Sequence, residues 1–236
     1  MREQPEQQAP PVQRLRVRYA KRGRLRFTSH RDFSRAFERA LVRARIPMAY
    51  SSGFNPHPRI SYAGAAPTGA ASEAEYLEIG LAQTVEPHRL AEDLDRALPD
   101  GLDVVEVVEA SPGSLADRLE ASRWQIDVPL PMEVVAPAVE EFLGRSSVTV
   151  ERMTKKGIRS FDSRAAVLEL RASAHDETSR LSVVLRHTVP AVRPDDVLTG
   201  LREVGGLEDV GAPLVTRLAQ GPLERSTGTI GDPLSG

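Results

Sequence analysis

Two short segments near the N-terminus hold the residue types that could perform acid–base chemistry. They are Thr28–Asp32 and Tyr50–Arg59, and each combines a histidine with hydroxyl groups and an arginine. If His30 and His57 came together, one could act as a general acid and the other as a general base at a phosphate or a ribose hydroxyl. The neighbouring arginines would then stabilise the negative charge that develops. This is one hypothesis for the two segments.

The same residues also have structural interpretations. Ser29 or Asp32 is a candidate N-cap for a helix that follows, and His30 between them could be held by the carboxylate. Gly53 and the segment Pro56–Pro58 could have the purely structural role of shaping a turn. A nucleophilic triad is discounted here, because adjacent residues at the start of a helix cannot line up as nucleophile, base and orienting group.

Positive charge is concentrated near the N-terminus, although the whole chain has a formal net charge of −2. Residues 1–70 contain 14 Lys and Arg against 4 Asp and Glu, whereas residues 71–236 contain 17 against 29. Of the first 14 basic residues, 13 are arginine, which binds phosphate in a bidentate manner and stacks on bases. The pattern favours a phosphate-rich partner, and RNA is our first choice. A merely solvated face, or one that docks on acidic protein, is the alternative.

The residues that we expect to contact RNA are basic, aromatic or amide side chains, most of them in the N-terminal region. They are Arg16, Arg18, Arg31, Arg35, Arg39, Arg43, Tyr50, Phe54, Asn55, Arg59, Lys155 and Lys156. Phe54 is either a core anchor or a platform on which a base stacks. Lys155 and Lys156 form a basic turn that could bind phosphate or only keep a sheet edge soluble.

Local patterns predict the elements that carry these residues. From residue 14 the sequence RLRVRYA alternates apolar residues with arginine, which is typical of a half-buried strand with an arginine face. A helix is expected to follow Ser29, with Phe33 and Phe37 on its apolar side and arginines in a row at four-residue spacing. It should end before Ile46-Pro47, because proline disfavours a helical residue before it.

The complete pattern predicts an α+β fold with two ferredoxin-like (βαββαβ-type) units in tandem. We expect a disordered N-terminus over residues 1–13 and an arginine-rich unit over 14–110. A connector over 111–122, a second α+β unit over 123–222 and a disordered tail over 223–236 complete the expected organisation.

Composition excludes several classes of protein. The chain has no cysteine, so disulfide scaffolds, thiolate nucleophiles and Cys-ligated metal or iron–sulfur sites are excluded. The five histidines are scattered without a metal-ligand spacing, and we expect neither a metal nor another cofactor. No run approaches the roughly 18 apolar residues of a spanning helix, and the N-terminal residues lack the apolar core of a signal peptide. We therefore expect a cytoplasmic protein without a membrane partner.

Two motifs carry a resemblance to a known family: Ser-His-Arg-Asp at 29–32 and Tyr-Ser-Ser-Gly-Phe-Asn-Pro-His-Pro at 50–58. On these motifs the chain resembles the radical-SAM-linked family, a domain of unknown function found alone or at the C-terminus of B12-binding radical SAM proteins. The resemblance is dense over residues 15–79 and thinner beyond, where it rests on Lys156, Asp162, Arg164 and Arg193-Pro194. Its implied signature positions are Ser29, His30, Asp32, Arg39, Tyr50, Gly53, Asn55, His57 and Pro58.

The chain departs from the family pattern in one respect and resembles its stand-alone form in another. Residues 65–69 read Ala-Ala-Pro-Thr-Gly, where the family would place a leucine-containing turn. The radical SAM half needs three cysteines for its cluster, so a chain without cysteine resembles the stand-alone form and cannot perform that chemistry itself. Pairs of ferredoxin-like units also occur in CRISPR-type RNA endonucleases, but this analogy concerns only the fold.

Three functions are compatible with these observations. The first is an accessory module that binds tRNA or rRNA, has no catalytic activity of its own, and presents the RNA to a separate radical SAM or RNA-processing enzyme. The second is a metal-independent enzyme that cleaves or modifies RNA with His30 and His57. The third is a protein-interaction adaptor.

Overall fold

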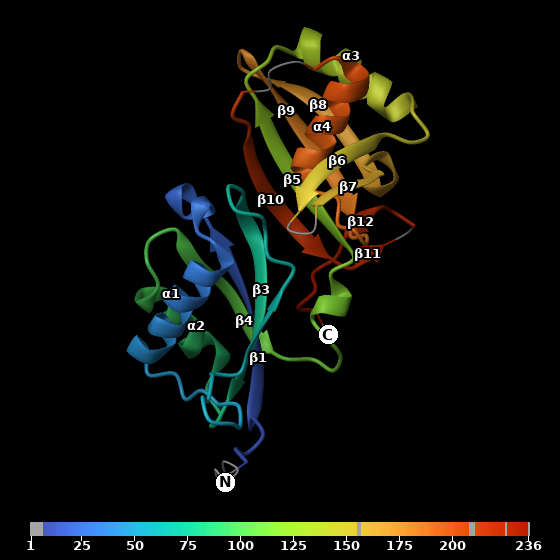
Figure 1. Ribbon diagram of the computed structural model, residues 1–236. Coiled ribbons are helices and arrows are strands. Elements are labelled where there is room, and N and C mark those ends of the chain that lie inside the picture. Colours follow the sequence, from blue (N-terminus) through green and yellow to red (C-terminus); the bar gives the residue numbers. More distant parts are fainter. Residues whose placement is uncertain (1–6, 155–156, 208–210, 225, 236) are drawn as a thin grey trace. The chain divides into compact units, whose positions relative to one another are not determined.

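The structure, a computed structural model, describes residues 7–235 apart from 155–156, 208–210 and 225 (Figure 1). The chain is α+β, as predicted, with helices packed on antiparallel sheets. It divides into two compact units, residues 1–118 together with 233–236, and residues 119–232. The division falls inside the segment 111–122 that the sequence marks as a connector.

The first unit is built around a central strand, β1, which pairs antiparallel with β3 on one side and β4 on the other. Because β2 pairs with the opposite edge of β3, the strands of this unit are ordered β4-β1-β3-β2. Helices α1 and α2 lie on one face of this sheet (Figure 1). The elements are β1 (Gln13–Lys21), the 3-10 helix η1 (Gly23–Phe27), α1 (His30–Arg43), β2 (Ile60–Ala63), β3 (Ala71–Leu81), α2 (Pro87–Ala97) and β4 (Leu102–Glu109).

The core of the first unit forms between the sheet and its two helices. Leu15, Val17 and Tyr19 alternate along β1 and are all buried, as the sequence predicts for one face of a strand. Phe33 packs on Tyr19 with the ring centroids 4.5 Å apart and the planes 5° from parallel. Phe37, one helical turn further, is fully buried. These contacts turn the apolar side of α1 to the sheet and leave its arginines facing solvent.

The second unit has a four-stranded antiparallel sheet in the order β10-β5-β9-β8, and β6 and β7 form a separate hairpin. Helices α3 and α4 pack side by side (Figure 1). The elements are η2 (Ala116–Arg118) at the end of the first unit, then β5 (Ala121–Val128), α3 (Met132–Gly144), β6 (Thr149–Thr154), β7 (Gly157–Asp162), η3 (Arg164–Ala166), β8 (Val167–His175), β9 (Thr178–Arg186), α4 (Pro194–Gly205), β10 (Leu214–Gly221), β11 (Leu223–Glu224) and β12 (Thr229–Ile230).

Some local expectations differ from the structure. The segment 223–236, expected to be disordered, contains the short β11–β12 hairpin, and Leu234 is buried. Residues 157–162 form a strand, β7, paired with β6. Apart from the β6–β7 and β11–β12 hairpins, the second unit repeats the strand and helix order of the first. The assignment of both units to the ferredoxin-like fold stays an interpretation of that order.

Close approach of α3 and α4 gives a test of the packing in the second unit. A Cβ added at Gly200 of α4 would lie 2.7 Å from Cε2 of Phe142 and 2.9 Å from Oγ of Ser163. Alanine normally stabilises a helix relative to glycine by about 1 kcal/mol. Here the clash outweighs that gain, so we expect Gly200→Ala to lower the free energy of unfolding by about 1–3 kcal/mol, measured by urea denaturation.

Gly144, the last residue of α3, is the matched control, because an added Cβ there would meet nothing within 4 Å. We expect Gly144→Ala to leave stability unchanged or to raise it by up to about 1 kcal/mol. Equal stability of the two variants would contradict the tight α3–α4 contact.

Candidate nucleic-acid interface

Three arginines form a row on the solvent side of α1. Arg31, Arg35 and Arg39 are spaced four residues apart, so neighbours in the row lie about 6 Å from each other along the helix axis. All three side chains are exposed. Within the part of the chain that the structure describes, none of them makes an ion pair or a side-chain hydrogen bond. We call this set the arginine row.

The start of α1 is held by a capping interaction that explains two of the motif residues. Ser29 is the N-cap, and its hydroxyl accepts a hydrogen bond from the backbone N–H of Asp32 at 3.2 Å. The same hydroxyl donates to the Asp32 carboxylate at 2.7 Å. The predicted cap is thus confirmed at Ser29, and the Asp32 carboxylate adds negative charge where the helix dipole favours it. His30 between them is exposed. Its ring packs nearly perpendicular to that of Tyr62, with the two centroids 4.8 Å apart.

The prediction that Arg16 and Arg18 of β1 contact RNA is corrected by the structure, because these side chains do not form an open face. Arg16 is fully buried and donates to the Ser111 hydroxyl at 2.7 Å and to the backbone oxygens of Ser111 and Gly113 at 2.9 and 2.7 Å. Arg18 is half-buried and donates to the backbone oxygen of Glu73 at 3.0 Å. The side chains of β1 alternate as predicted. The segment after β4, however, covers the middle of the arginine face of this strand.

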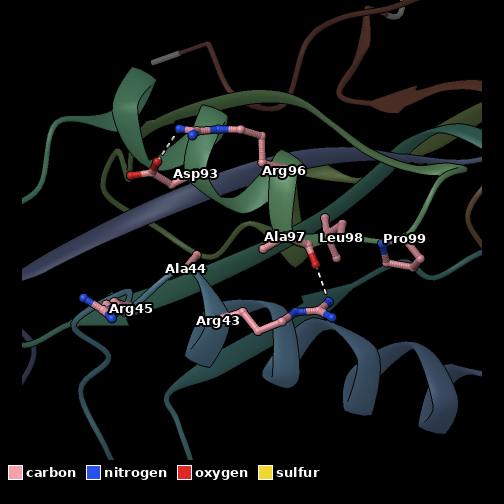
Figure 2. Close-up of a pocket in the computed structure, with 8 residues that line it drawn as sticks. All are labelled: Arg43, Ala44, Arg45, Asp93, Arg96, Ala97, Leu98 and Pro99. Atoms are coloured by element: carbon pink, nitrogen blue, oxygen red, sulfur yellow. Dashed lines mark hydrogen bonds and ion pairs between the residues drawn. The ribbon is translucent and has the colours of Figure 1, made fainter.

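Arg43 continues the spacing of the row but points to a different place. Its guanidinium reaches the last residue of α2 and donates to the backbone oxygen of Ala97 (Figure 2). Arg96 pairs with Asp93 at 2.5 Å on the other side of the same surface cavity, which has a volume of about 520 Å³. Helix C-termini carry partial negative charge that arginine side chains stabilise. The arginines of this cavity therefore have a structural role, and Arg43 is not part of the arginine row.

The loop from Tyr50 to Arg59 is closed at its base by backbone pairing. Tyr50 and Pro58 form an antiparallel bridge, and the backbone N–H of Ser51 donates to the His57 oxygen at 2.9 Å. The His57 N–H returns a bond to the Ser51 hydroxyl at 3.0 Å. Arg59, half-buried, donates to the Tyr50 oxygen at 3.1 Å. These bonds hold the base of the loop in a fixed conformation, and the residues between its two ends extend into solvent.

The tip of this loop is exposed. Phe54 has 64% of its surface in contact with solvent, so it is not a core anchor, and the interpretation as a stacking platform stays open. Asn55 is exposed beside it, and Tyr50 at the base is also exposed. Gly53 has φ of +128°, a conformation that side chains rarely adopt, so the turn before Phe54 requires glycine.

His30 and His57 are not brought together by the fold. The ring of His30 contacts Tyr62, which lies on β2 and pairs with Leu77 of β3. His57 precedes Tyr62 by five residues, and the chain between them is extended because Arg59 already pairs with Gly80. At about 3.3 Å per residue, the backbone of His57 lies roughly 16 Å from that of Tyr62, the residue whose ring His30 contacts. The structure therefore gives no support to a shared acid–base pair.

The motif residues of the second unit have structural partners. Asp162 accepts backbone N–H bonds from Val148 at 3.0 Å and from Arg164 at 2.9 Å. Burial opposes ionisation of Asp162, but these bonds outweigh it and lower the pKa of its carboxyl. The Arg193 N–H donates to Asp196 at 2.7 Å at the start of α4. Lys155 and Lys156, the predicted basic turn, lie outside the described residues.

One polar cluster was not predicted because its members lie far apart in the sequence. The side chain of His187 contacts the Leu119 oxygen through Nδ1 at 2.6 Å and the Ser122 hydroxyl through Nε2 at 3.1 Å. Trp124 donates to the same hydroxyl at 2.8 Å. A serine bonded to a histidine can be a nucleophile with its base. Ser122 is only 2% exposed, which shields its hydroxyl from a substrate, whereas His187 reaches the surface beside a cavity of about 470 Å³.

Neither a cluster of metal-ligating side chains nor a membrane-spanning helix is found among the described residues. No three His, Asp or Glu side chains there are grouped so that they could hold a metal ion. No helix in the described ranges has both the length and the apolar character needed to cross a membrane.

Comparisons with other proteins identify a family but no function. A family model described as "uncharacterized protein conserved in bacteria (DUF2344)" matches residues 14–194. No curated protein matches the chain. An unknown protein from Galdieria sulphuraria shares 14% identity, with 87% of this chain and 96% of that chain covered and a TM-score of 0.25. A putative dyp-type peroxidase from Shewanella oneidensis shares 11% identity, with 89% of this chain and 90% of that chain covered and a TM-score of 0.23.

Arg16 is buried and Arg35 is exposed, so removing their side chains should change the stability of the protein by different amounts. Arg16→Ala empties a fully buried site and removes the donor to Ser111 and Gly113 and the ion-pair partner of Glu78, so we expect the free energy of unfolding to fall by about 3 kcal/mol or more. Arg35→Ala removes an exposed side chain, and it should change the free energy of unfolding by less than about 0.5 kcal/mol. Urea denaturation of both variants measures the difference, and similar losses would contradict the contrast between them.

The stability of the second unit should depend on the charge of His187. Burial is the main cause that lowers the pKa of His187, and the positive charge of Arg217 lowers it further, against the opposing bond to Leu119. As pH falls through about 6.5, the unfolded chain takes up a proton that the folded state binds less well. We therefore expect the free energy of unfolding to decrease between about pH 7.5 and about pH 5.5.

Other groups titrate in this range, so His187→Gln is the control. Its free energy of unfolding should fall less over the same pH interval than that of the wild-type protein. The same pH dependence in both proteins would show that His187 is not the group responsible.

Proposed function

We propose that this chain, which belongs to the family of uncharacterized proteins conserved in bacteria (DUF2344), binds RNA through the arginine row of α1. One observation carries the proposal. The guanidinium groups of Arg31, Arg35 and Arg39 are exposed side by side, and none of them has an anionic partner among the described residues. A polyanion with regularly spaced charges is the partner that such a row fits.

A comparison within the first unit shows why the row is unusual. Arg22, also exposed at the surface, is neutralised by two carboxylates. It donates from Nε to Glu73 at 2.8 Å and pairs with Asp103 at 2.8 Å. The hydrogen bond to Glu73 is the main cause that raises the pKa of Arg22 above its ordinary value. Other exposed arginines of the first unit, such as Arg89 and Arg96, also pair with a carboxylate. No member of the arginine row does so among the described residues.

The spacing of the row is unfavourable for α1 by itself. Like charges at four-residue spacing destabilise a helix by about 0.2–0.5 kcal/mol per pair. A bound phosphate chain would reverse this cost, because guanidinium binds phosphate oxygens in a bidentate manner. The exposed Tyr50, Phe54 and Asn55 of the loop add groups that can stack on bases or hydrogen-bond to them.

The accessory role rests on the chemistry that this chain lacks and on its resemblance to the radical-SAM-linked family. Without cysteine, the chain cannot hold a radical SAM cluster. Among the described residues, no contact joins His30 to His57, so nothing supports an acid–base pair. We infer that the chain binds tRNA or rRNA and presents it to a modifying or processing enzyme that is a separate protein.

Salt-dependent binding tests this proposal directly. In filter-binding titrations against total cellular RNA, we expect the logarithm of the affinity to fall with the logarithm of salt concentration with a slope of about −2 or steeper, as three phosphate contacts predict. Arg35→Glu/Arg39→Glu should weaken binding by roughly tenfold or more at about 0.1 M salt.

The matched control is Arg171→Glu/Arg202→Glu, which makes the same change in net charge at exposed positions of the second unit. It should bind RNA almost as well as the wild type. Equal losses in both double variants, or wild-type binding that is insensitive to salt, would contradict the proposal. Binding to an acidic protein without any binding to RNA would support an adaptor instead.

A further inference from the structure

Phe27 is an aromatic side chain that folding does not use. It is the last residue of η1, just before α1, and 60% of its surface is exposed. The other aromatic residues of β1 and α1, namely Tyr19, Phe33 and Phe37, are buried in the core. Phe27 is absent from the motifs that the sequence analysis singled out.

The backbone around Phe27 is held on both sides. The Leu25 N–H donates to the Arg22 oxygen at 3.0 Å, and the Thr28 N–H donates to the Leu25 oxygen at 2.9 Å. The Gly69 N–H donates to the oxygen of Arg26 at 2.8 Å, which ties η1 to the loop before β3. The ring is therefore presented from an ordered backbone, and binding to it requires little additional ordering.

The surroundings of the ring are basic. The guanidinium carbon of Arg26 lies over the Phe27 ring, 4.7 Å from its centroid. Arg24 is exposed in the same short helix, and Arg31 of the arginine row follows four residues later. A guanidinium on an aromatic ring, with further arginines nearby, is the combination that binds a stacked base together with its phosphates.

We propose that Phe27 stacks on an unpaired base of RNA, and that the ligand of this face is single-stranded RNA or the loop of a folded RNA. This inference rests on the proposed function and specifies its ligand. A paired base offers no open face, and the deep, narrow major groove of an RNA duplex does not admit side chains. An exposed ring beside the arginine row therefore favours an unpaired strand.

The position of Phe27 relative to α1 extends the binding face. Phe27 precedes the first turn of α1, whereas Phe54 lies in the loop that follows the other end of the helix. The 14 residues of α1 span about 21 Å at 1.5 Å per residue. The strand would run along the arginine row, with its phosphates on the arginines and one base on Phe27.

A fluorescent base analogue tests the stacking step. A single-stranded RNA that contains 2-aminopurine loses fluorescence when the analogue stacks on an aromatic ring, and we expect this quenching with the full-length wild-type chain. Phe27→Ala should remove the quenching and weaken binding of the single strand by roughly fivefold or more. Phe27→Trp should retain both. The duplex of the same sequence should bind more weakly, and Phe27→Ala should not change its affinity.

Val105→Ala is the matched control, because Val105 is an exposed apolar residue on β4 of the same unit, outside the proposed binding face, without an aromatic ring. It should behave as the wild type. Since Phe27 is exposed, Phe27→Ala should keep the wild-type unfolding curve, so any loss of binding reflects the ring itself.

The outcomes separate this inference from the proposed function. If Phe27→Ala binds the single strand as tightly as the wild type while Arg35→Glu/Arg39→Glu does not, the stacking role is overturned and the arginine row stands. A stronger affinity for the duplex also overturns it. Failure of the wild type to bind any RNA overturns both. If Phe27→Ala instead loses binding only to vesicles of anionic phospholipid, Phe27 serves a membrane surface and the inference is wrong.

Discussion

The packing of α1 against β1 is the interaction on which the candidate interface depends. Phe33 stacks on Tyr19 with parallel rings, and Phe37 fills the core one turn further along the helix. Removing a buried phenylalanine typically costs about 3–5 kcal/mol, whereas repulsion between neighbouring arginines costs only about 0.2–0.5 kcal/mol per pair. The core contacts therefore decide the rotation of the helix. The arginine row faces solvent because the apolar stripe must face the sheet.

Arginines of similar sequence context perform different tasks in this unit, and their partners distinguish them. Arg16 is buried and joins β1 to the segment after β4, while Arg43 satisfies a carbonyl at the end of α2. The three members of the arginine row are exposed on one helix without an anionic partner among the described residues, and the exposed Arg24 and Arg45 of the same unit share this property. The charge count of the first 70 residues thus overstates the basic surface available to a partner. What remains is a narrow face on α1, with the exposed Phe27 just before the helix in the sequence and the exposed Phe54 in the loop after it.

Local patterns were sufficient to predict the α+β class, the buried side of α1, the Ser29 cap and the alternation of β1, because each depends on neighbouring residues. Contacts between distant segments were not predictable in this way. The cover over Arg16 comes from residues about 95 positions later, and His187 meets Ser122 across 65 positions. The separation of His30 from His57 follows from the register of β2 on β3, which no local pattern specifies. Phe27 was missed because a single aromatic residue in a short turn carries no periodic signal.

The account places the RNA on α1 and on the segments before and after it. Ultraviolet cross-linking of bound RNA to the full-length chain, followed by mass spectrometry of the linked peptides, tests this claim most directly. The account predicts cross-links within residues 24–43, with Phe27 among the linked positions, and further cross-links within the loop 50–59. Cross-links confined to the second unit, or distributed evenly over both units, would contradict it.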